Sequence, residues 1–174
     1  MKVCFITHAF PPAETAAASY SKIFVEELIK NDVEVVLITS RRNNSAPAFE
    51  KTDGLSIYRV NFQLPIFMDY FEFMSKLSQV LGPIYKKEEF DLIHSEHLFP
   101  APSAAKLAKK YKLPHVVTIE GVSTVSIYSK ALFQLHKLLL PRINYDMLVS
   151  WGRYVLNKYF LKWGISKEKS TVIP

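Results

Sequence analysis

Short apolar runs rich in β-branched residues recur along this chain, and segments with helical spacing of apolar residues separate them. The run Val33–Thr39 is nearly continuous in apolar residues, which is typical of a strand covered on both faces of a parallel sheet. Between Lys2–Thr7 and this run, apolar residues return at helical intervals from Thr15 to Lys30. The alternation predicts an α/β fold, with helices on both faces of a parallel sheet.

The same pattern divides the rest of the chain. Predicted strands cover Lys2–Thr7, Val33–Thr39, Leu55–Val60, Asp91–His94, His115–Ile119, Tyr145–Val149 and Thr171–Ile173. Predicted helices cover Thr15–Lys30, Met68–Tyr85, Pro100–Lys112, Ser126–Leu140 and Trp151–Trp163. Thr15 and Ser150 are expected to cap helices, and Gly164 is expected to end one. The segment Arg41–Asp53 is expected to be a polar loop, and Leu55–Val60 to lie near an edge of the sheet.

Size and composition indicate one globular domain of 174 residues, 49% of them hydrophobic and 22% charged. The longest stretch without Asp, Glu, Lys or Arg, Val3–Ala13, has 11 residues, whereas a membrane-spanning helix needs about 18. The single cysteine, Cys4, rules out an internal disulfide and fits a reducing compartment. We therefore expect a cytoplasmic protein that meets a membrane, if at all, as a peripheral protein at its inner face.

Positive charge is concentrated in the second half of the chain. Residues 1–90 carry 10 basic and 11 acidic side chains, a net charge of −1, whereas residues 91–174 carry 12 basic and 5 acidic side chains, a net charge of +7. This asymmetry indicates either an anionic partner or a solvated, lysine-rich surface. Nucleic acid is not expected as the partner, because no basic-aromatic recognition motif is present.

In open parallel sheets, ligands bind at the carboxyl ends of the strands. The first such loop contains no glycine, which excludes a dinucleotide-binding GxGxxG loop and a P-loop. The small residues Ala16, Ala17 and Ala18 begin the next helix, so its N–H groups are either open to an anion or part of an ordinary buried helix start.

Two further strand ends carry ionisable residues. The segment His94–His97 holds two imidazoles and a carboxylate, which fit either a polar rim that faces a substrate or a zinc site; we favour the rim and predict no metal. Glu120 follows a buried strand directly, and its carboxylate fits either a base that accepts a proton from an attacking hydroxyl or a structural group.

The segment Gly121–Tyr145 contains no acidic residue and mixes lysines with leucines. Its helix is expected either to lie on an anionic membrane surface or, more often for such patterns, to pack on the sheet with its lysines in water. The aromatic segment Phe62–Phe73 leaves the same two alternatives open: exposure for a lipid acceptor, or burial in the core.

Four segments resemble one known family. They are KVCFITHAFPP, LIKNDVEVVLITS, FDLIHSEHLFPAPSAAKLAKKYKLPHVVTIEG and YDMLVSWGRYVLNKYFLKWGISKEKSTVIP. Together they resemble the N-terminal half of GT-B glycosyltransferases, closest to the retaining enzymes of family 4. The resemblance implies a Rossmann-like domain over residues 1–174 that is cut at the interdomain linker, and an absent C-terminal domain that holds most of a nucleotide-sugar donor.

For the full-length protein, the resemblance implies a hexosyltransferase of polysaccharide biosynthesis that moves sugar from a nucleotide-sugar to a glycan or lipid-linked acceptor. The nucleotide-sugar is a co-substrate, no other cofactor is expected, and the isolated domain is expected to be inactive. The implied catalytic residue is Glu120, and Ala16, Ala17 and Ala18 are the implied contacts to donor phosphate. The implied substrate-binding residues are His8, Ser19, Tyr20, Glu96, His97, Gly121 and Ser150.

Three positions depart from the family pattern. Ala16–Ala18 stands where the family usually has a Gly-Gly pair, and His94-Ser95-Glu96, followed by His97, stands where it has His-x-His. Glu120 replaces a histidine that normally contacts the reacting sugar or the acceptor. The loss of the Gly-Gly pair and the presence of Glu120 favour the alternative hypothesis of a non-catalytic relative that binds a sugar or a partner, whereas the otherwise intact pattern favours an enzyme.

Overall fold

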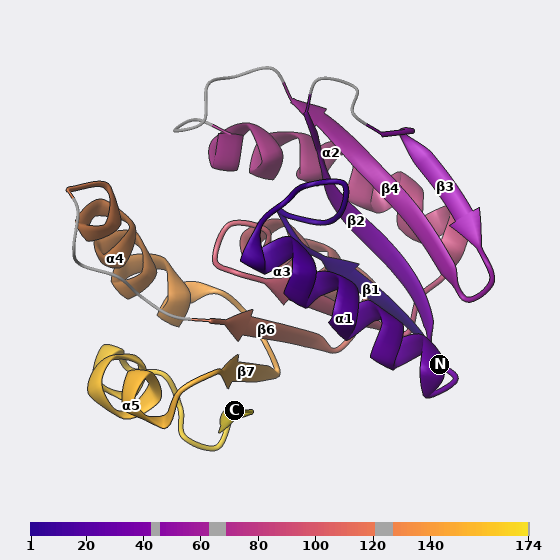
Figure 1. Ribbon diagram of the computed structural model, residues 1–174. Helices are drawn as coiled ribbons and strands as arrows, with labels where there is room; N and C mark the ends of the chain where they lie inside the picture. Colours follow the sequence, from indigo (N-terminus) through magenta and orange to yellow (C-terminus); the bar gives the residue numbers. More distant parts are fainter. Residues whose placement is uncertain (43–45, 63–68, 121–126, 174) are drawn as a thin grey trace.

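The computed structural model describes residues 1–42, 46–62, 69–120 and 127–173 (Figure 1). The strands are β1 (Lys2–Ile6), β2 (Glu34–Arg42), β3 (Phe49–Thr52), β4 (Leu55–Phe62), β5 (Leu92–Glu96), β6 (His115–Ile119), β7 (Met147–Ser150) and β8 (Ser170–Val172). The helices are α1 (Ala16–Lys30), α2 (Asp69–Glu88), α3 (Ala101–Tyr111), α4 (Ile127–Leu139) and α5 (Arg153–Val155). Short 3-10 turns follow at Leu140–Arg142 and Leu161–Trp163, and a π turn at Leu156–Phe160.

Within the described ranges, the strands form one sheet in the order β3-β4-β2-β1-β5-β6-β7-β8. Every neighbouring pair is parallel except β3 with β4. The chain builds outward from β1 to β4 on one side and then crosses to β5 on the other side of β1. The predicted Rossmann-like α/β fold is therefore confirmed, and the strand order reverses between β1 and β5, where such sheets open a crevice at their carboxyl ends.

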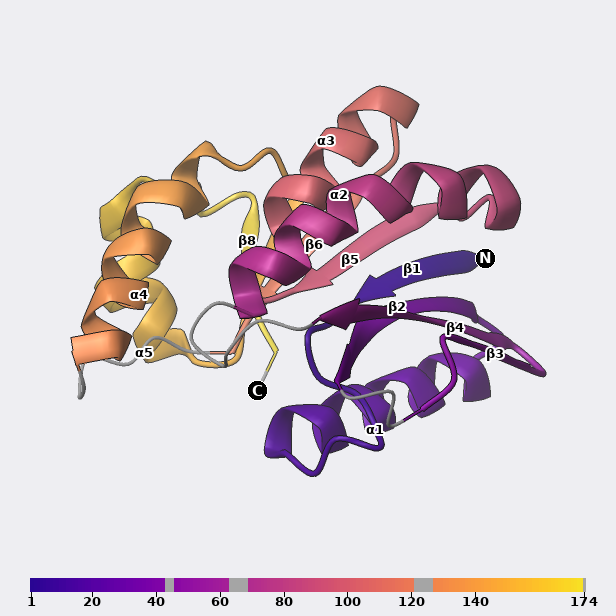
Figure 2. The ribbon, with the colours of Figure 1, turned by 90° about the horizontal axis from the view of Figure 1, so that it is seen from above.

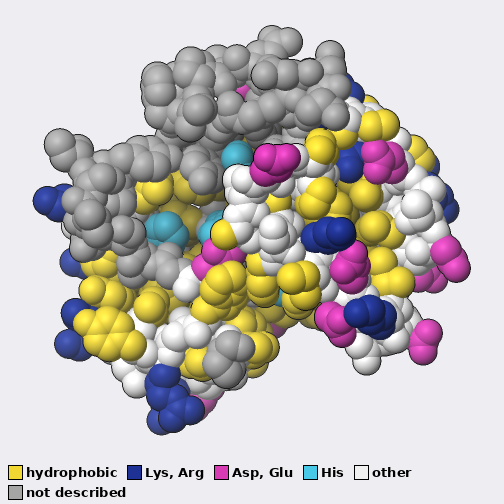
Figure 3. Space-filling model, viewed as in Figure 1, with side chains coloured by type: hydrophobic (Ala, Val, Ile, Leu, Met, Phe, Trp, Pro, Cys, Tyr) yellow, Lys and Arg dark blue, Asp and Glu magenta, His cyan; other side chains and the backbone are white. Residues whose placement is uncertain are grey.

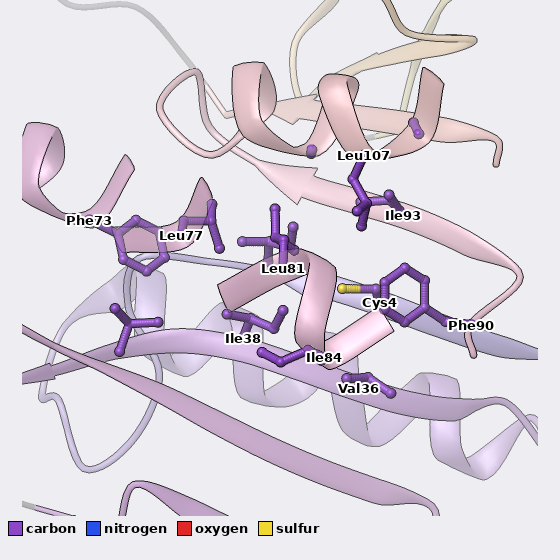
Figure 4. Packing of buried hydrophobic residues seen from close by; sticks show 14 residues of the cluster. Cys4, Val36, Ile38, Phe73, Leu77, Leu81, Ile84, Phe90, Ile93 and Leu107 are labelled. Carbon is purple, nitrogen blue, oxygen red and sulfur yellow. The ribbon is translucent and has the colours of Figure 1, made fainter. Parts of the chain in front are cut away.

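Helices cover both faces of the sheet, as predicted (Figure 2). On one face, α1 packs Val25 against Phe5 and Leu37. On the opposite face, α2 and α3 bury a larger apolar cluster that includes Phe73, Leu77 and the Cys4 side chain (Figure 4). Among the helices that the structure describes, none combines the length and hydrophobicity that crossing a membrane requires.

The predicted polar loop Arg41–Asp53 is wrong, because it contains the end of β2 and the antiparallel edge strand β3. Three of the four β3 residues are exposed, so the strand lacks the apolar alternation that marks half-buried strands. A two-residue turn at Asp53-Gly54 pairs Thr52 with Leu55, and Gly54 has a φ of 72°. Because β3 occupies the edge, β4 lies between two strands and not at the edge as expected.

The predicted helix Trp151–Trp163 is also corrected. It begins at Arg153, with Gly152 at the N-cap, and changes from α to π and 3-10 geometry. Ser150 is the last residue of β7 and does not cap a helix, because its hydroxyl donates to the carbonyl of Gly152 at 3.1 Å. The helix ends as predicted at Gly164, which has a φ of 91°.

Candidate active site

Three ionisable side chains meet at the carboxyl ends of β5 and β6, beside the point where the strand order reverses. Glu96 is the last residue of β5, His97 follows it, and Glu120 comes directly after β6. The strand predicted to end at His94 continues to Glu96. Glu96 therefore belongs to the sheet and lies opposite Thr118 of β6. Figure 3 shows histidine and acidic side chains together in a hollow of this face of the molecule.

Glu96 is held from the α1 side of the sheet. Its side chain is fully buried, and its Oε2 accepts a hydrogen bond of 2.8 Å from the hydroxyl of Ser21. The Ser21 hydroxyl lies 3.2 Å from that of Thr7, at the end of β1. The second carboxylate oxygen of Glu96, Oε1, is buried without a hydrogen-bond partner in the described residues. Helix α1 therefore fixes one carboxylate oxygen of Glu96 and leaves the other unused.

Glu120 and His97 form the more open side of the cluster. Glu120 Oε1 lies 3.5 Å from His97 Nε2, and the two side chains are 21% and 30% exposed. The backbone N–H of His97 donates to the carbonyl of Thr118 at 2.8 Å, and His97 has a φ of 69°, so its backbone is held in the left-handed region. Like the unused oxygen of Glu96, Glu120 Oε1 accepts no hydrogen bond from the described residues.

Burial shifts the protonation of this cluster. It raises the pKa of Glu96 to about 8; the nearby Glu120 carboxyl adds to the shift, and the hydroxyls of Thr7 and Ser21 oppose it. Burial also lowers the pKa of His97, although the charge of Glu120 opposes that shift. The two carboxyl groups can therefore lie together because one of them keeps a proton at neutral pH, beside a neutral imidazole.

In the zinc alternative at His94–His97, which the sequence did not favour, His94 does not fit the role of a ligand. His94 Nε2 is engaged with the hydroxyl of Thr118 at 2.6 Å, and its ring packs edge-on against Phe5 and Phe24. Burial, with a smaller contribution from His115, lowers the pKa of His94 to about 4, which is typical of a neutral core histidine. Among the described residues, ligand atoms of Glu96, His97 and Glu120 lie within 4.8 Å of one another, close enough to hold a metal ion.

The predicted phosphate contacts lie at the start of α1. The Thr15 hydroxyl caps the helix, as predicted, and accepts a hydrogen bond of 3.1 Å from the N–H of Ala18. Ala18 is also fully buried, so its N–H group is not open to an anion. The N–H groups of Ala16 and Ala17 are the ones that an anion could contact at this helix start. The role of these residues stays a prediction.

The other predicted substrate residues fall into two groups. Tyr20 lies near the cluster: burial, together with the charges of Glu96 and Glu120, raises the pKa of its hydroxyl, and its ring contacts Trp151 at 4.4 Å between centroids. His8 follows β1 at the same edge of the sheet, and Ser19 is exposed in the first turn of α1. Ser150 is buried at the end of β7, and Gly121 lies outside the described residues.

A pocket of about 650 Å³ continues from this edge along the α1 side of the sheet. Its walls are mostly apolar, and it is lined by Tyr20, Ile23, Phe24, Glu27, His94, Val116, Thr118, Val149, Trp151 and Ile173. Sequence reasoning assigned no role to Trp151 or Ser21. Trp151 follows a predicted strand end, which is a usable signal, whereas Ser21 gives none, because it reaches Glu96 across 75 residues of sequence.

A match to a protein-family model identifies the kind of domain that contains this site. The model, described as Glycosyltransferase Family 4, matches residues 17–174. The chain belongs to Glycosyltransferase Family 4. The resemblance to family 4 inferred from the sequence is thereby confirmed, and the fold is of the GT-B type. Among curated proteins, no sequence matches this family 4 chain.

Solved structures share the fold at low sequence identity. Sucrose-phosphate synthase from Thermosynechococcus elongatus is 15% identical, with a TM-score of 0.79 over 99% of this chain and 47% of that one. UDP-GlcNAc 2-epimerase from Methanocaldococcus jannaschii is 16% identical, with a TM-score of 0.63 over 99% and 45%. Anabaena HepE in complex with UDP and glucose is 14% identical, with a TM-score of 0.63 over 99% and 44%. The chain thus spans less than half the length of these proteins.

Proposed function

We propose that this chain is the acceptor-side half of a retaining hexosyltransferase, which moves a sugar from a nucleotide-sugar to a glycan or lipid-linked acceptor in polysaccharide biosynthesis. The observation that carries the proposal is the family 4 match over residues 17–174, together with an ionisable cluster at the switch point of the sheet. A similar structure was solved with UDP and glucose bound, which supports a nucleotide-sugar as co-substrate.

Glu120 is the proposed catalytic residue. Its carboxylate stands at the carboxyl end of β6, is partly exposed, and has one oxygen without a hydrogen-bond partner in the described residues. An acceptor hydroxyl that enters at this edge can donate its hydrogen bond to the partly exposed Glu120 carboxylate and later release its proton to it. Tyr20, His97 and the apolar pocket beside them are placed to hold the rest of the acceptor.

The donor is proposed to bind mainly to a C-terminal domain that faces this edge. Transfer needs a closed cleft that excludes water and stabilises the leaving diphosphate, which a single half does not provide. We therefore expect residues 1–174 alone to show no turnover. The test is to supply the full-length protein with a panel of nucleotide-sugars and acceptors and to determine the product anomer by NMR. Transfer with retention supports the proposal, and inversion at the anomeric carbon contradicts it.

A non-catalytic binding protein is the second candidate. The observation that favours it is Glu120 itself, since the family usually has a histidine there and a carboxylate differs in charge and hydrogen bonding. The same panel separates the two functions. Saturable binding of a nucleotide-sugar or glycan by the full-length protein, with no transfer to any acceptor, would support the binding protein and contradict the enzyme.

A basic and apolar surface at the end of α4 supports peripheral membrane contact. Lys137, Leu138, Arg142 and Trp163 line a shallow pocket there, and Leu138 is 52% exposed. Such a surface suits an enzyme whose acceptor is anchored in an anionic bilayer. Liposomes that contain phosphatidylglycerol should retain the full-length protein at low salt and release it at high salt. Retention that is unchanged in Lys137→Glu/Arg142→Glu contradicts a role for this surface.

A further inference from the structure

We propose that Glu96, His97 and Glu120 bind one divalent transition-metal ion, of the class of Zn²⁺ or Mn²⁺, at the carboxyl ends of β5 and β6. The three side chains come from two neighbouring parallel strands and meet at one edge of the sheet. Glu120 is also the proposed catalytic base, so a bound ion occupies a group that sugar transfer would use, and the test below measures metal binding alone.

The distances suit an ion of this size. One ligand atom from each residue lies within 4.8 Å of the other two. A point equidistant from three such atoms is at most about 2.8 Å from each, so side-chain movements of roughly 0.6 Å or less bring them to metal–ligand bonds of about 2.0–2.2 Å. The 3.5 Å between His97 Nε2 and Glu120 Oε1 already matches two ligands of a tetrahedral ion, which are about 3.4 Å apart.

A second observation indicates that something is bound here. Glu96 Oε1 and Glu120 Oε1 are both buried, and neither has a hydrogen-bond partner in the described residues. The other oxygen of Glu96 is already held by Ser21, so the free oxygen faces the neighbouring Glu120 carboxyl. A single proton can bridge the two carboxyl groups, but it leaves the imidazole of His97 unused. One cation engages all three side chains at once.

The chemistry of the ligands narrows the choice of metal. Two carboxylate oxygens and one imidazole nitrogen suit Zn²⁺, Mn²⁺ or Fe²⁺, whereas Mg²⁺ and Ca²⁺ favour oxygen ligands alone. The hydroxyl of Ser21 donates to the other oxygen of Glu96 and fixes the orientation of that carboxylate. Because His97 and Glu120 are partly exposed, the ion can enter from solvent, and three protein ligands leave a coordination position open for water or a substrate oxygen.

The test is direct metal binding by the full-length protein after treatment with a chelator. Titration with Zn²⁺, followed by calorimetry, should give one site that Glu120→Gln and His97→Ala each weaken by about 100-fold or more. Ser21→Ala, which removes only the supporting hydroxyl, should weaken binding by about 10-fold. Substitution with Co²⁺ should give visible absorption bands that disappear in His97→Ala, and Mn²⁺ should lose its free-ion EPR signal on binding.

The matched control is Glu26→Gln, which removes a carboxylate from the exposed side of α1 and should leave the affinity unchanged. Circular dichroism shows whether each variant is folded. Because His97 is partly exposed, His97→Ala should fold even if Glu96→Gln does not. The proposal is overturned if wild type binds none of the three ions saturably. It is equally overturned if folded His97→Ala and Glu120→Gln bind as tightly as wild type. Neither result depends on whether sugar transfer is detected.

Discussion

The amino-terminal part and the carboxyl end of β5 are both buried, but only in the first of these regions is the loss of contact with water fully compensated. Ile93 is completely buried in the apolar cluster under α2 and α3, where contact with other side chains replaces water. Three residues later, Glu96 is just as buried, yet one of its oxygens has no hydrogen-bond partner in the described residues. Such uncompensated burial costs stability, so it indicates a part of the sheet shaped for binding.

The largest effect should come from the compensated region. Leu77→Ala removes a fully buried side chain of α2 and leaves a cavity in the apolar cluster. We expect a loss of about 2–5 kcal/mol in the free energy of unfolding, measured by urea denaturation. A change below about 1 kcal/mol would mean that this cluster is not the well-packed core.

A satisfied buried histidine provides the next test. His115 Nδ1 lies 3.0 Å from the carbonyl of Asn144, and Nε2 lies 2.8 Å from the Ser95 hydroxyl, which suits a neutral ring that donates at Nδ1 and accepts at Nε2. Burial lowers the pKa of His115, although its hydrogen bond to Asn144 and the charge of Asp146 oppose this. The folded protein thus binds fewer protons than the unfolded chain, and stability falls as the pH drops below the ordinary value of 6.5.

We expect His115 to contribute at most about 1.4 kcal/mol per pH unit to this loss. The measurement is the free energy of unfolding of wild type and His115→Gln between neutral and mildly acidic pH. The variant should lose less stability on acidification than wild type. Identical slopes in the two proteins would contradict a neutral, buried His115.

Glu96→Gln should change the free energy of unfolding in the opposite direction from a core substitution. The amide oxygen still accepts from Ser21, and the amide NH2 replaces the unpaired Glu96 oxygen and donates toward the unpaired oxygen of Glu120. We expect the free energy of unfolding in metal-free buffer at mildly alkaline pH to rise by about 1 kcal/mol, while metal binding is lost. A clear loss of stability would show that Glu96 is a structural residue and that the two ends of β5 do not differ in this way.

The smallest effect concerns the cap of α1. Thr15→Ala removes the acceptor for the N–H of Ala18 and should cost about 1 kcal/mol of stability. Thr15→Asp keeps an acceptor and serves as the control, with stability near that of wild type in thermal unfolding. A Thr15→Ala variant as stable as wild type would show that the cap is unimportant.

The sequence predicted the fold well because its strands are buried. Runs such as Val33–Thr39 carry a strong apolar signal, and the family segments extend over most of the chain. The polar strand β3 was missed because its exposed residues carry no such signal, although the Asp53-Gly54 turn marked the hairpin.

The candidate site was predicted only in part. Glu96, His97 and Glu120 were identified because each follows or ends a predicted strand. The sequence did not show that Glu96 is fully buried, or that Ser21 of α1 holds it, because that contact exists only after the sheet and the helix have packed. For the same reason, the metal hypothesis was attached to His94, whose ring turns toward Phe5 and Phe24 instead.

In the proposed function, sugar transfer occurs at the carboxyl edge of β5 and β6, with Glu120 as the catalytic residue. The most direct test compares initial rates of transfer by full-length wild type, Glu120→Gln and the exposed control Glu168→Gln, each with its melting temperature. We expect Glu120→Gln to lower kcat by at least about 100-fold with an unchanged melting temperature, while Glu168→Gln is as active as wild type. A Glu120→Gln protein that transfers sugar at the wild-type rate would contradict it.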